Sequence, residues 1–415
     1  MDNRRSYIFV FFLLAALGVT GPALFVLLVD PYQIYHKSFI QPAMFSVNER
    51  YQSAGLINSY LDESYDAIII GSSLSENFNT EQVSRVTGWK KTMRLTVNAS
   101  TSEMPQEHLL VLQKALATGH IKHVLWEIHP KYIWVKDDQL DQVSEKFPEY
   151  LYNESVFDDY HYLFNDDVVK LSIKNILGQL DTLCENGCNY EWSHQWLDNF
   201  EALNQWMLRE KLNEKNNGFH RFSRSAKLKA YDTKIRKNKA DLDVNEILEK
   251  SRFYHSSFIT ERVERLIANN PDTHFNLYIP PIPSFFYAEK KNGNLIATMG
   301  LYRQIAKVGS KHKNVSFYAF NNLFQITNNV AFYKDEHHYH SDVNDYIVKR
   351  MSLDLDRVSP ENFDQYALVF LSNLKTLEVQ FFDKVDLNKL EPEIDKRVIG
   401  AGDNITDAEK KDWQQ

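Results

Sequence analysis

Short apolar runs recur along the chain with the pattern of strands that are buried on both faces of a sheet. The first, Asp66–Ile70, contains three consecutive isoleucines and ends at Gly71, as expected in a parallel sheet covered by helices on both sides. Four further runs have the same character: Met93–Val97, His123–Ile128, His274–Ile279 and Val315–Phe320. The pattern therefore predicts five strands.

A helical pattern separates the second and third of these runs. Residues 105–117 place leucines at the spacing of one helix face, with Pro105 near the start and Gly119 positioned as a stop. Alternation of strands and helices implies right-handed βαβ units. The predicted fold class is α/β: a flavodoxin-like, doubly wound and mostly parallel five-stranded sheet.

The first thirty residues predict a membrane anchor. Tyr7–Val29 is a run of 23 residues without a charge, enough at ~1.5 Å per residue to cross ~30 Å of hydrocarbon. A cleaved secretory signal is the alternative, but its apolar region is usually ~7–15 residues long and leads to a cleavage site, whereas Asp30-Pro31-Tyr32 follows here. Because Arg4 and Arg5 precede the run, the positive-inside rule predicts a cytoplasmic N-terminus, with the remaining chain outside.

A long stretch between the third and fourth strands predicts an insertion. It is far longer than a crossover helix requires, is rich in aromatic residues and contains helical patterns at Val244–Tyr254 and Ile259–Ile267. We expect a mainly helical subdomain or lid. The predicted organisation is residues 1–29, a cytoplasmic stub and transmembrane helix; 30–130, the first half of the α/β domain; 131–270, the insertion; 271–358, the second half; and 359–415, a helical segment and charged tail.

Composition and charge exclude several classes of protein. Charged residues make up 25% and hydrophobic residues 43% of the 415 positions, which excludes disorder throughout, collagen and a multi-span membrane protein. The 47 Lys and Arg against 55 Asp and Glu give a net charge of −8, so we expect no nucleic-acid partner. The two cysteines, Cys184 and Cys188, form either a short-loop disulfide in an oxidising compartment or two free thiols.

One segment departs from this acidic balance. Arg209–Lys239, inside the insertion, holds eleven Lys and Arg against three Asp and Glu, a local excess of eight positive charges. Such a run is either a solvated face or a patch that binds an anionic glycan or lipid headgroups.

Two polar clusters could supply a nucleophile and its base. Gly71–Leu74 directly follows the first strand, so its serines are expected at the carboxyl edge of the sheet, where open α/β folds bind ligands. A serine nucleophile needs a base, and the base needs an orienting group. Asp335 and His338 are three residues apart, close enough for one loop to present both, and a helix is expected to open at Ser341.

Each cluster also has other interpretations. The two serines are compatible with an ordinary tight turn, and Ser72 competes with Ser73 as nucleophile. His337 competes with His338 as base. A metal-dependent hydrolase using His337, His338 and His340 is a third possibility, although this spacing suits no standard zinc site.

Together these blocks resemble the SGNH (GDSL-type) hydrolase superfamily. Gly71–Leu74 is similar to the first block, whose second serine position, here Ser73, is the nucleophile. The Asp-x-x-His of the last block matches Asp335 and His338. A membrane-anchored subgroup, the DltD-like and alginate-acetylation-like envelope acyl-transfer proteins, also tends to have Asp-Pro-Tyr after the anchor and a strand running into Pro-Pro, as at 30–32 and 278–281 here. The resemblance covers roughly residues 30–130 and 270–350.

The middle blocks depart from the superfamily pattern. The expected oxyanion-hole glycine and the GxND sequence are absent; Asn98 follows the second strand, and Glu127 and His129 follow the third. We expect Asn98 to donate its side-chain amide to the oxyanion, together with the backbone N–H of Ser73 or its neighbour. Glu127 and His129 are secondary candidates for substrate contact.

The resemblance implies a membrane-anchored, extracytoplasmic serine esterase or O-acyltransferase. In it Ser73 attacks an acyl ester, His338 is base and then acid, and Asp335 orients His338. The implied substrate is an acylated polysaccharide of a bacterial cell envelope, with O-acetyl transfer or removal, no cofactor and no metal. The implied location is the inner membrane, through residues 7–29, beside a membrane-bound acyltransferase partner. The alternative is a non-catalytic glycan-binding or assembly protein on the same scaffold, which the missing GxND favours and the intact Ser, Asp and His oppose.

Overall fold

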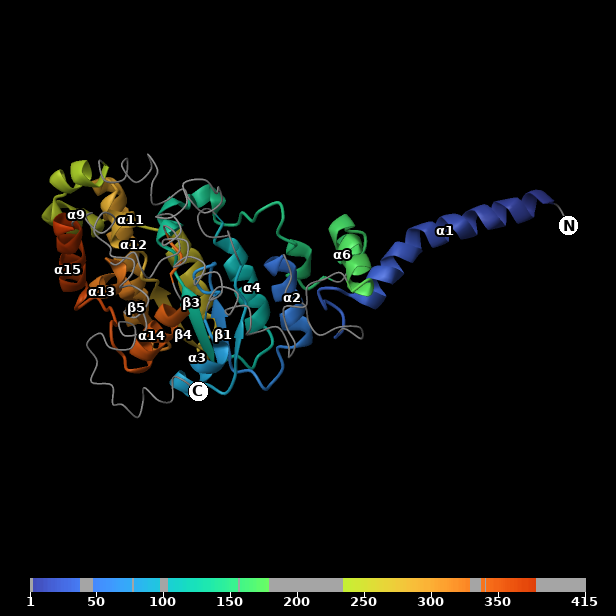
Figure 1. Ribbon diagram of the computed structural model, residues 1–415, viewed down its shortest axis with the longest axis horizontal. Helices are drawn as coiled ribbons and strands as arrows, with labels where there is room; N and C mark the ends of the chain where they lie inside the picture. Colours follow the sequence, from blue (N-terminus) through green and yellow to red (C-terminus); the bar gives the residue numbers. More distant parts are fainter. Residues whose placement is uncertain are drawn as a thin grey trace, which may run out of the picture.

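A five-stranded parallel sheet forms the centre of the molecule (Figure 1). The computed structural model describes residues 3–37, 48–76, 78–97, 104–155, 157–178, 234–328, 337–339 and 341–377. The strands are β1 (Ala67–Ile70), β2 (Thr92–Arg94), β3 (His123–Glu127), β4 (His274–Ile279) and β5 (Val315–Ala319). Their spatial order is β2-β1-β3-β4-β5 and every pairing is parallel. The five predicted strands and the α/β class are confirmed, and the strand order is consistent with a flavodoxin-like sheet.

The sheet is buried on both faces, as the apolar runs predicted. The side chains of Ile68, Ile69 and Ile70 are fully excluded from solvent, and consecutive side chains of a strand point to opposite faces. β2 ends at Arg94, earlier than the predicted strand. Beyond it the chain still follows β1, because Val97 donates its N–H to the carbonyl of Gly71 at 2.9 Å. The strand ends therefore lie together at one edge of the sheet.

Helices cover both faces of the sheet (Figure 1). On one face α3 (Thr80–Thr87), the crossover from β1 to β2, contacts α14 (Ser341–Ser352). Right-handed crossovers place α4 (Gln106–Leu116) and α12 (Asn292–Lys311) on the other face. Further described helices are α1 (Asn3–Val29), α2 (Glu49–Ser59), α5 (Tyr160–Leu163), α6 (Asp166–Ile176), α9 (Val244–Ser251), α10 (Glu264–Ala268), α11 (Ser284–Ala288), α13 (Phe324–Thr327) and α15 (Phe363–Thr376).

Local sequence signals explain where the helices begin and end. The side chain of Asn79 caps α3 by accepting the N–H of Gln82 at 3.0 Å, and Gly88 ends the helix with a φ of 74°. The predicted helix at residues 105–117 is α4, and Gly119 follows it with a φ of 82°. The predicted helix opening at Ser341 is the start of α14.

The insertion between β3 and β4 is described in part. Its predicted helical patterns correspond to α9 and to a π-helical turn, Phe258–Val263, that continues into α10. Most of the basic segment, together with Cys184 and Cys188, lies outside the described residues, so those predictions stay predictions. At the described end of the basic segment, Lys234 pairs with Glu289 at 3.0 Å.

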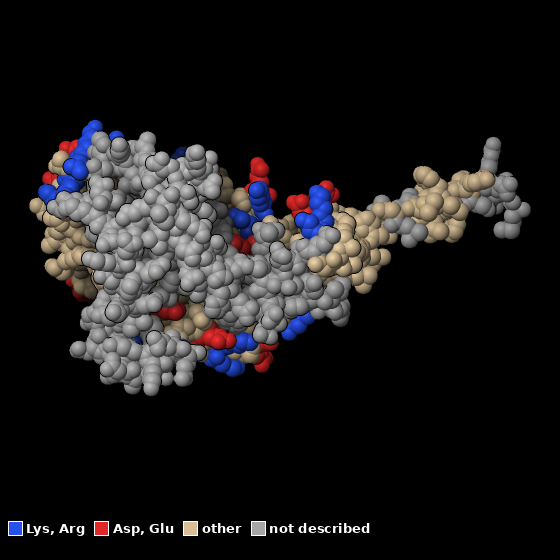
Figure 2. Space-filling view, viewed as in Figure 1, with Lys and Arg blue, Asp and Glu red and all other residues tan. Residues whose placement is uncertain are grey.

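Helix α1 extends away from the rest of the molecule (Figure 1). On the face shown in Figure 2 the side chains of this helix that are drawn in colour are neither acidic nor basic, and apolar side chains such as Tyr7 (73%) and Phe9 (67%) are exposed. No helix formed by the described residues is both long and apolar enough to cross a membrane. The anchor expected at residues 7–29 stays a prediction.

The end of α1 is fixed to the body through Asp30. This buried residue, at a φ of 40°, accepts the backbone N–H groups of Ile34 (3.0 Å), Tyr35 (2.7 Å) and His36 (3.0 Å). Its carboxylate also accepts the hydroxyl of Tyr162, from α5, at 2.8 Å. The Asp-Pro-Tyr segment is therefore a turn that joins the end of α1 to α5 of the insertion through hydrogen bonds.

Candidate active site

The turn after β1 meets the residues before α14 at the carboxyl edge of the sheet. There Ser73 Oγ lies 2.7 Å from His338 Nε2, although the two residues are 265 positions apart in the chain. Both side chains are half-buried. This distance is within the 2.6–3.2 Å range expected between a nucleophile and its general base, so the structure brings together two residues that the sequence singled out.

The backbone around Ser73 forms a tight turn that begins directly after Gly71. The N–H of Ser75 donates to the carbonyl of Ser72 at 2.9 Å, which closes the turn. A Cβ atom on Gly71 would lie 2.1 Å from Ser75 Oγ and 2.7 Å from Glu127, so only glycine fits before the turn. Ser73 occupies the corner and projects toward His338.

Glu127, at the end of β3, lies against the inner side of this turn and is 1% exposed. Its Oε2 accepts the N–H of Ser72 at 3.0 Å and the Oγ–H of Ser75 at 2.5 Å, and its Oε1 accepts the Oγ–H of Ser72 at 2.7 Å. Burial raises the pKa of Glu127, and the hydrogen bonds from Ser75 and Ser72 oppose that rise. All three of these hydrogen bonds come from the serine turn, and the predicted contact of Glu127 with substrate stays a prediction.

These contacts also separate the roles of the two neighbouring serines. Ser72 is 1% exposed, and its hydroxyl is directed to Glu127 while its oxygen accepts the N–H of Leu74 at 3.2 Å. Ser73 is the serine that faces His338. The geometry supports Ser73 over Ser72 as the nucleophile.

The two adjacent histidines likewise face different neighbours. The ring of His337 packs edge-on against Phe286, from α11, with centroids 4.9 Å apart, whereas His338 faces Ser73. Among the described residues no cluster of three or more His, Cys, Asp or Glu side chains is arranged to hold a metal ion.

His129 lies just beyond β3 and is 3% exposed. Its Nδ1 accepts the N–H of Lys131 at 3.1 Å. Burial lowers the pKa of His129 well below its usual 6.5, and the positive charge of Lys131 and interactions with His337 and His338 lower it further. His129 is therefore a neutral imidazole beside the candidate site, and its predicted contact with substrate stays a prediction.

Two predicted site residues, Asp335 and Asn98, lie outside the described part of the chain. Their roles in orienting His338 and in stabilising an oxyanion stay predictions. Conversely, sequence reasoning missed Asn344, a buried residue of α14 whose amide donates to the carbonyl of Leu74 at 3.4 Å. This bond connects α14 to the serine turn, and no sequence signal distinguished Asn344 from other polar residues of the helix.

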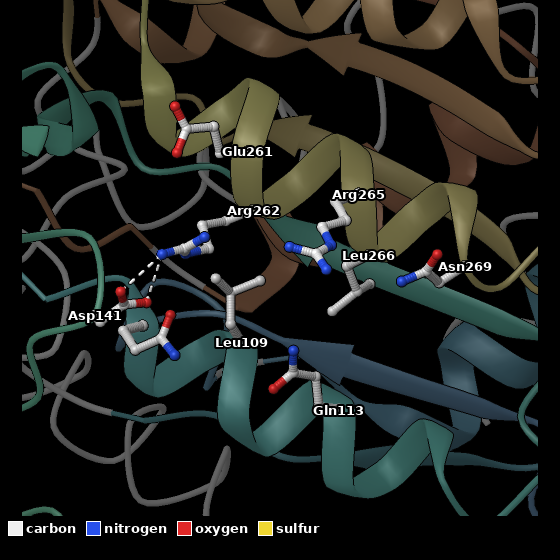
Figure 3. A pocket seen from close by; sticks show the side chains of 9 residues that line it. Leu109, Gln113, Asp141, Glu261, Arg262, Arg265, Leu266 and Asn269 are labelled. Atoms are coloured by element: carbon white, nitrogen blue, oxygen red, sulfur yellow. Dashed lines mark hydrogen bonds and ion pairs between the residues drawn. The ribbon is translucent and has the colours of Figure 1, made fainter.

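A separate pocket of about 380 Å³ lies between α4 and the π-helical turn that continues into α10 (Figure 3). Arg262 and Arg265 project into it opposite Gln113 of α4, and Arg262 is held by both carboxylate oxygens of Asp141 at 2.7 Å. Of the two arginines, Arg262 is paired with Asp141. None of its lining residues belongs to the site around Ser73.

Comparisons of the chain with protein-family models, with curated proteins and with solved structures gave no match. A functional assignment therefore depends on the fold, the site geometry and the sequence blocks.

Proposed function

We propose that this protein is a serine esterase or O-acyltransferase on an SGNH-type scaffold, with Ser73 as nucleophile and His338 as general base. The observation that carries the proposal is the 2.7 Å hydrogen bond between Ser73 Oγ and His338 Nε2. Two further observations support it: the pair lies at the carboxyl edge of a parallel sheet, where such folds bind ligands, and Ser73 occupies the corner of a turn that permits only glycine before it.

In the proposed reaction Ser73 Oγ attacks the carbonyl carbon of an acyl ester while its proton passes to His338 Nε2. The tetrahedral intermediate collapses, His338 returns the proton to the leaving alcohol oxygen, and the acyl group stays on Ser73. Water or a sugar hydroxyl then attacks the acyl-enzyme with His338 again as base, which releases the acyl product and restores Ser73. Asp335 is proposed to orient His338, and Asn98 with backbone N–H groups to stabilise the oxyanion.

The substrate class and the location are part of the same proposal. The resemblance to envelope acyl-transfer proteins supports an acylated envelope polysaccharide as substrate and a membrane-bound acyltransferase as partner. The uncharged run at residues 7–29 and the exposed apolar side chains of α1 support insertion of this helix in the inner membrane, with the site on the periplasmic side.

A fluorophosphonate probe, which reacts with activated serines, tests the nucleophile. We expect the parent protein and the control Ser310→Ala, which changes an exposed serine of α12, to be labelled equally, and Ser73→Ala to be unlabelled while unfolding at the same temperature. Labelling of Ser73→Ala at the parental rate would show that the nucleophile is another residue. A parent protein that neither reacts with the probe nor hydrolyses small acyl esters would instead favour the non-catalytic glycan-binding alternative.

Mass spectrometry separates hydrolysis from transfer. After brief exposure to an activated acetyl ester, we expect the peptide that contains Ser73 to carry one acetyl group. Adding a soluble oligosaccharide acceptor should then shorten the lifetime of this acyl-enzyme and produce acetylated sugar if the protein is a transferase. A lifetime that the acceptor does not change would assign the protein to the esterases.

A further inference from the structure

The carboxyl group of Glu127 lies buried beside the serine turn, and the proposed reaction gives it no role. We propose that Glu127 is a positioning residue that holds Ser72 and Ser75, on either side of Ser73, and thereby fixes Ser73 Oγ against His338. The catalytic consequence of this inference rests on the proposed function, but its geometric claim, that Glu127 maintains the Ser73–His338 hydrogen bond, does not.

The direction of the hydrogen bonds supports this role. Three donors, the N–H and Oγ–H of Ser72 and the Oγ–H of Ser75, converge on the two oxygens of Glu127. An ionised carboxylate only accepts hydrogen bonds, so it satisfies all three donors at once. A glutamine would bring two donors of its own and force at least one of these bonds to reverse.

The bonds extend across three neighbouring strands. Ile70 of β1 is in register with Trp126 of β3, so Glu127 follows beside Gly71. Glu127 is in turn in register with Tyr278 of β4, whose hydroxyl lies 2.7 Å from Ser75 Oγ. Because the Ser75 proton is directed to Glu127, Tyr278 donates to Ser75. The serine turn is therefore attached to β3 and β4 as well as to its own strand.

The burial of Glu127 argues against direct contact with substrate. Its side chain is 1% exposed, and its oxygens are already occupied by the turn. A buried carboxylate without a cationic partner among its described hydrogen bonds costs stability unless its donors compensate. A carboxylate that binds donors on both sides of Ser73 is the arrangement that preorganising this side chain requires.

The test compares two buried carboxylates. Glu127→Gln keeps the size of the side chain and removes its charge. Glu107→Gln is the matched control, because Glu107 is also fully buried but bonds Arg50 (2.8 Å) and the N–H of Ser144 (2.9 Å), away from Ser73. A purely structural role predicts that both variants lose stability and neither loses turnover per folded molecule.

The first readout is kinetic. With a small acyl ester we expect Glu127→Gln to lower kcat, and the rate of fluorophosphonate labelling, by about 10²-fold, the usual cost of misplacing a reacting group by about 1 Å. KM should hardly change, because Glu127 does not touch substrate, and Glu107→Gln should match the parent. Equal kcat in Glu127→Gln and Glu107→Gln would overturn the catalytic consequence.

The second readout reports the geometry directly. In ¹⁵N-histidine NMR spectra, with the His338 signal assigned from His338→Ala, we expect Glu127→Gln to shift the Nε2 resonance in the same direction as Ser73→Ala, and Glu107→Gln to leave it in place. An unmoved resonance would overturn the positioning role. If the parent is not labelled by the probe, the proposed function fails, while this spectrum still decides the role of Glu127.

A second pair of variants keeps the test usable if Glu127→Gln does not fold. Ser72→Ala and Ser75→Ala each delete one side-chain donor and leave the carboxylate in place. Each should lower kcat by about 10-fold, and their effects should not add when combined, because both act through Glu127. Parental kcat in both variants would overturn the proposal.

Discussion

Two turns of this protein are each organised by one buried carboxylate, but the carboxylates come from different parts of the chain. Asp30 belongs to the turn that it organises, and accepts N–H groups of residues 34–36. Glu127 belongs to another strand and accepts its hydrogen bonds from Ser72 and Ser75. Apart from the bond from Tyr162, the hydrogen bonds to Asp30 come from residues within six positions of it in the chain, whereas the bonds to Glu127 can form only once β1 and β3 have paired.

A tyrosine hydroxyl takes part in each arrangement. Tyr162 donates directly to the Asp30 carboxylate, and Tyr278 reaches Glu127 through Ser75. The difference teaches that the Asp30 carboxylate mainly connects neighbouring residues at the end of α1, while the candidate active site depends on the assembled sheet. Substitutions at the two carboxylates should therefore have different consequences.

The largest expected effect comes from the partner that faces Ser73. His338→Ala removes the proposed base, and we expect the hydrolysis of p-nitrophenyl acetate to fall on the order of 10⁴-fold, about as far as in Ser73→Ala, because groups that act as a unit are not additive. Steady-state kinetics with a urea-unfolding control measures this. Substantial residual activity in His338→Ala alone would assign the base to another residue.

A smaller, purely structural effect is expected at the other turn. Asp30→Ala leaves several N–H groups and the Tyr162 hydroxyl without their acceptor, so we expect a loss of about 2–4 kcal/mol from the local free energy of opening. Hydrogen exchange, followed in detergent, should accelerate at residues 34–36 and stay unchanged in β1, and esterase activity should persist. Loss of activity with slow exchange at residues 34–36 would contradict the separation of the two turns.

The pH dependence of stability sharpens the comparison at Glu127. Burial raises the pKa of Glu127 above its usual 4.5, so the folded protein binds this proton more tightly than the unfolded chain does. The stability contributed by the neutral form is present below pH 4.5 and is lost as pH rises through the raised pKa. The free energy of unfolding, measured with urea at several pH values across this window, should therefore decline less steeply with rising pH in Glu127→Gln than in the parent. Identical slopes would show that Glu127 does not titrate as a buried group.

The smallest effect is expected from an ion pair of which only the lysine is exposed. Lys234 lies 3.0 Å from Glu289, but the lysine side chain is 56% exposed and Glu289 keeps Lys290 as a second partner at 3.1 Å, so we expect the loss of Lys234 to cost less than about 1 kcal/mol. Lys234→Gln should therefore shift the urea midpoint only slightly, and less at high salt than at low salt. A loss of stability as large as that of Asp30→Ala would show that this ion pair contributes substantially to the fold.

Much of the fold could be predicted because its signals are local. The isoleucines of β1 and the glycine that follows them predict a buried strand in any context, and the proline and glycine around α4 delimit that helix. The Ser73–His338 pair could be anticipated because each residue sits in a short block that resembles a known family and follows a predicted strand or precedes a predicted helix.

The partner of Ser72 could not be predicted in the same way. Glu127 is 55 residues from Ser72, and only the register between Ile70 and Trp126 brings it beside Gly71. Register is a property of the paired sheet, and the apolar pattern of each strand is compatible with several pairings. From the sequence, a glutamate at the end of a strand is equally compatible with contacting substrate and with supporting the serine turn.

The hydrogen bonds across β1, β3 and β4 also constrain which substitutions this chain can accept during evolution. Ser72, Ser75, Glu127 and Tyr278 occupy distant positions in the sequence but form one hydrogen-bonded unit, and Gly71 admits no side chain beside it. A substitution at one of these positions leaves donors or acceptors of the others unmatched, so the five residues should be inherited or replaced together. In relatives of this chain we therefore expect these five residues to occur as a set, even where the rest of the sequence differs.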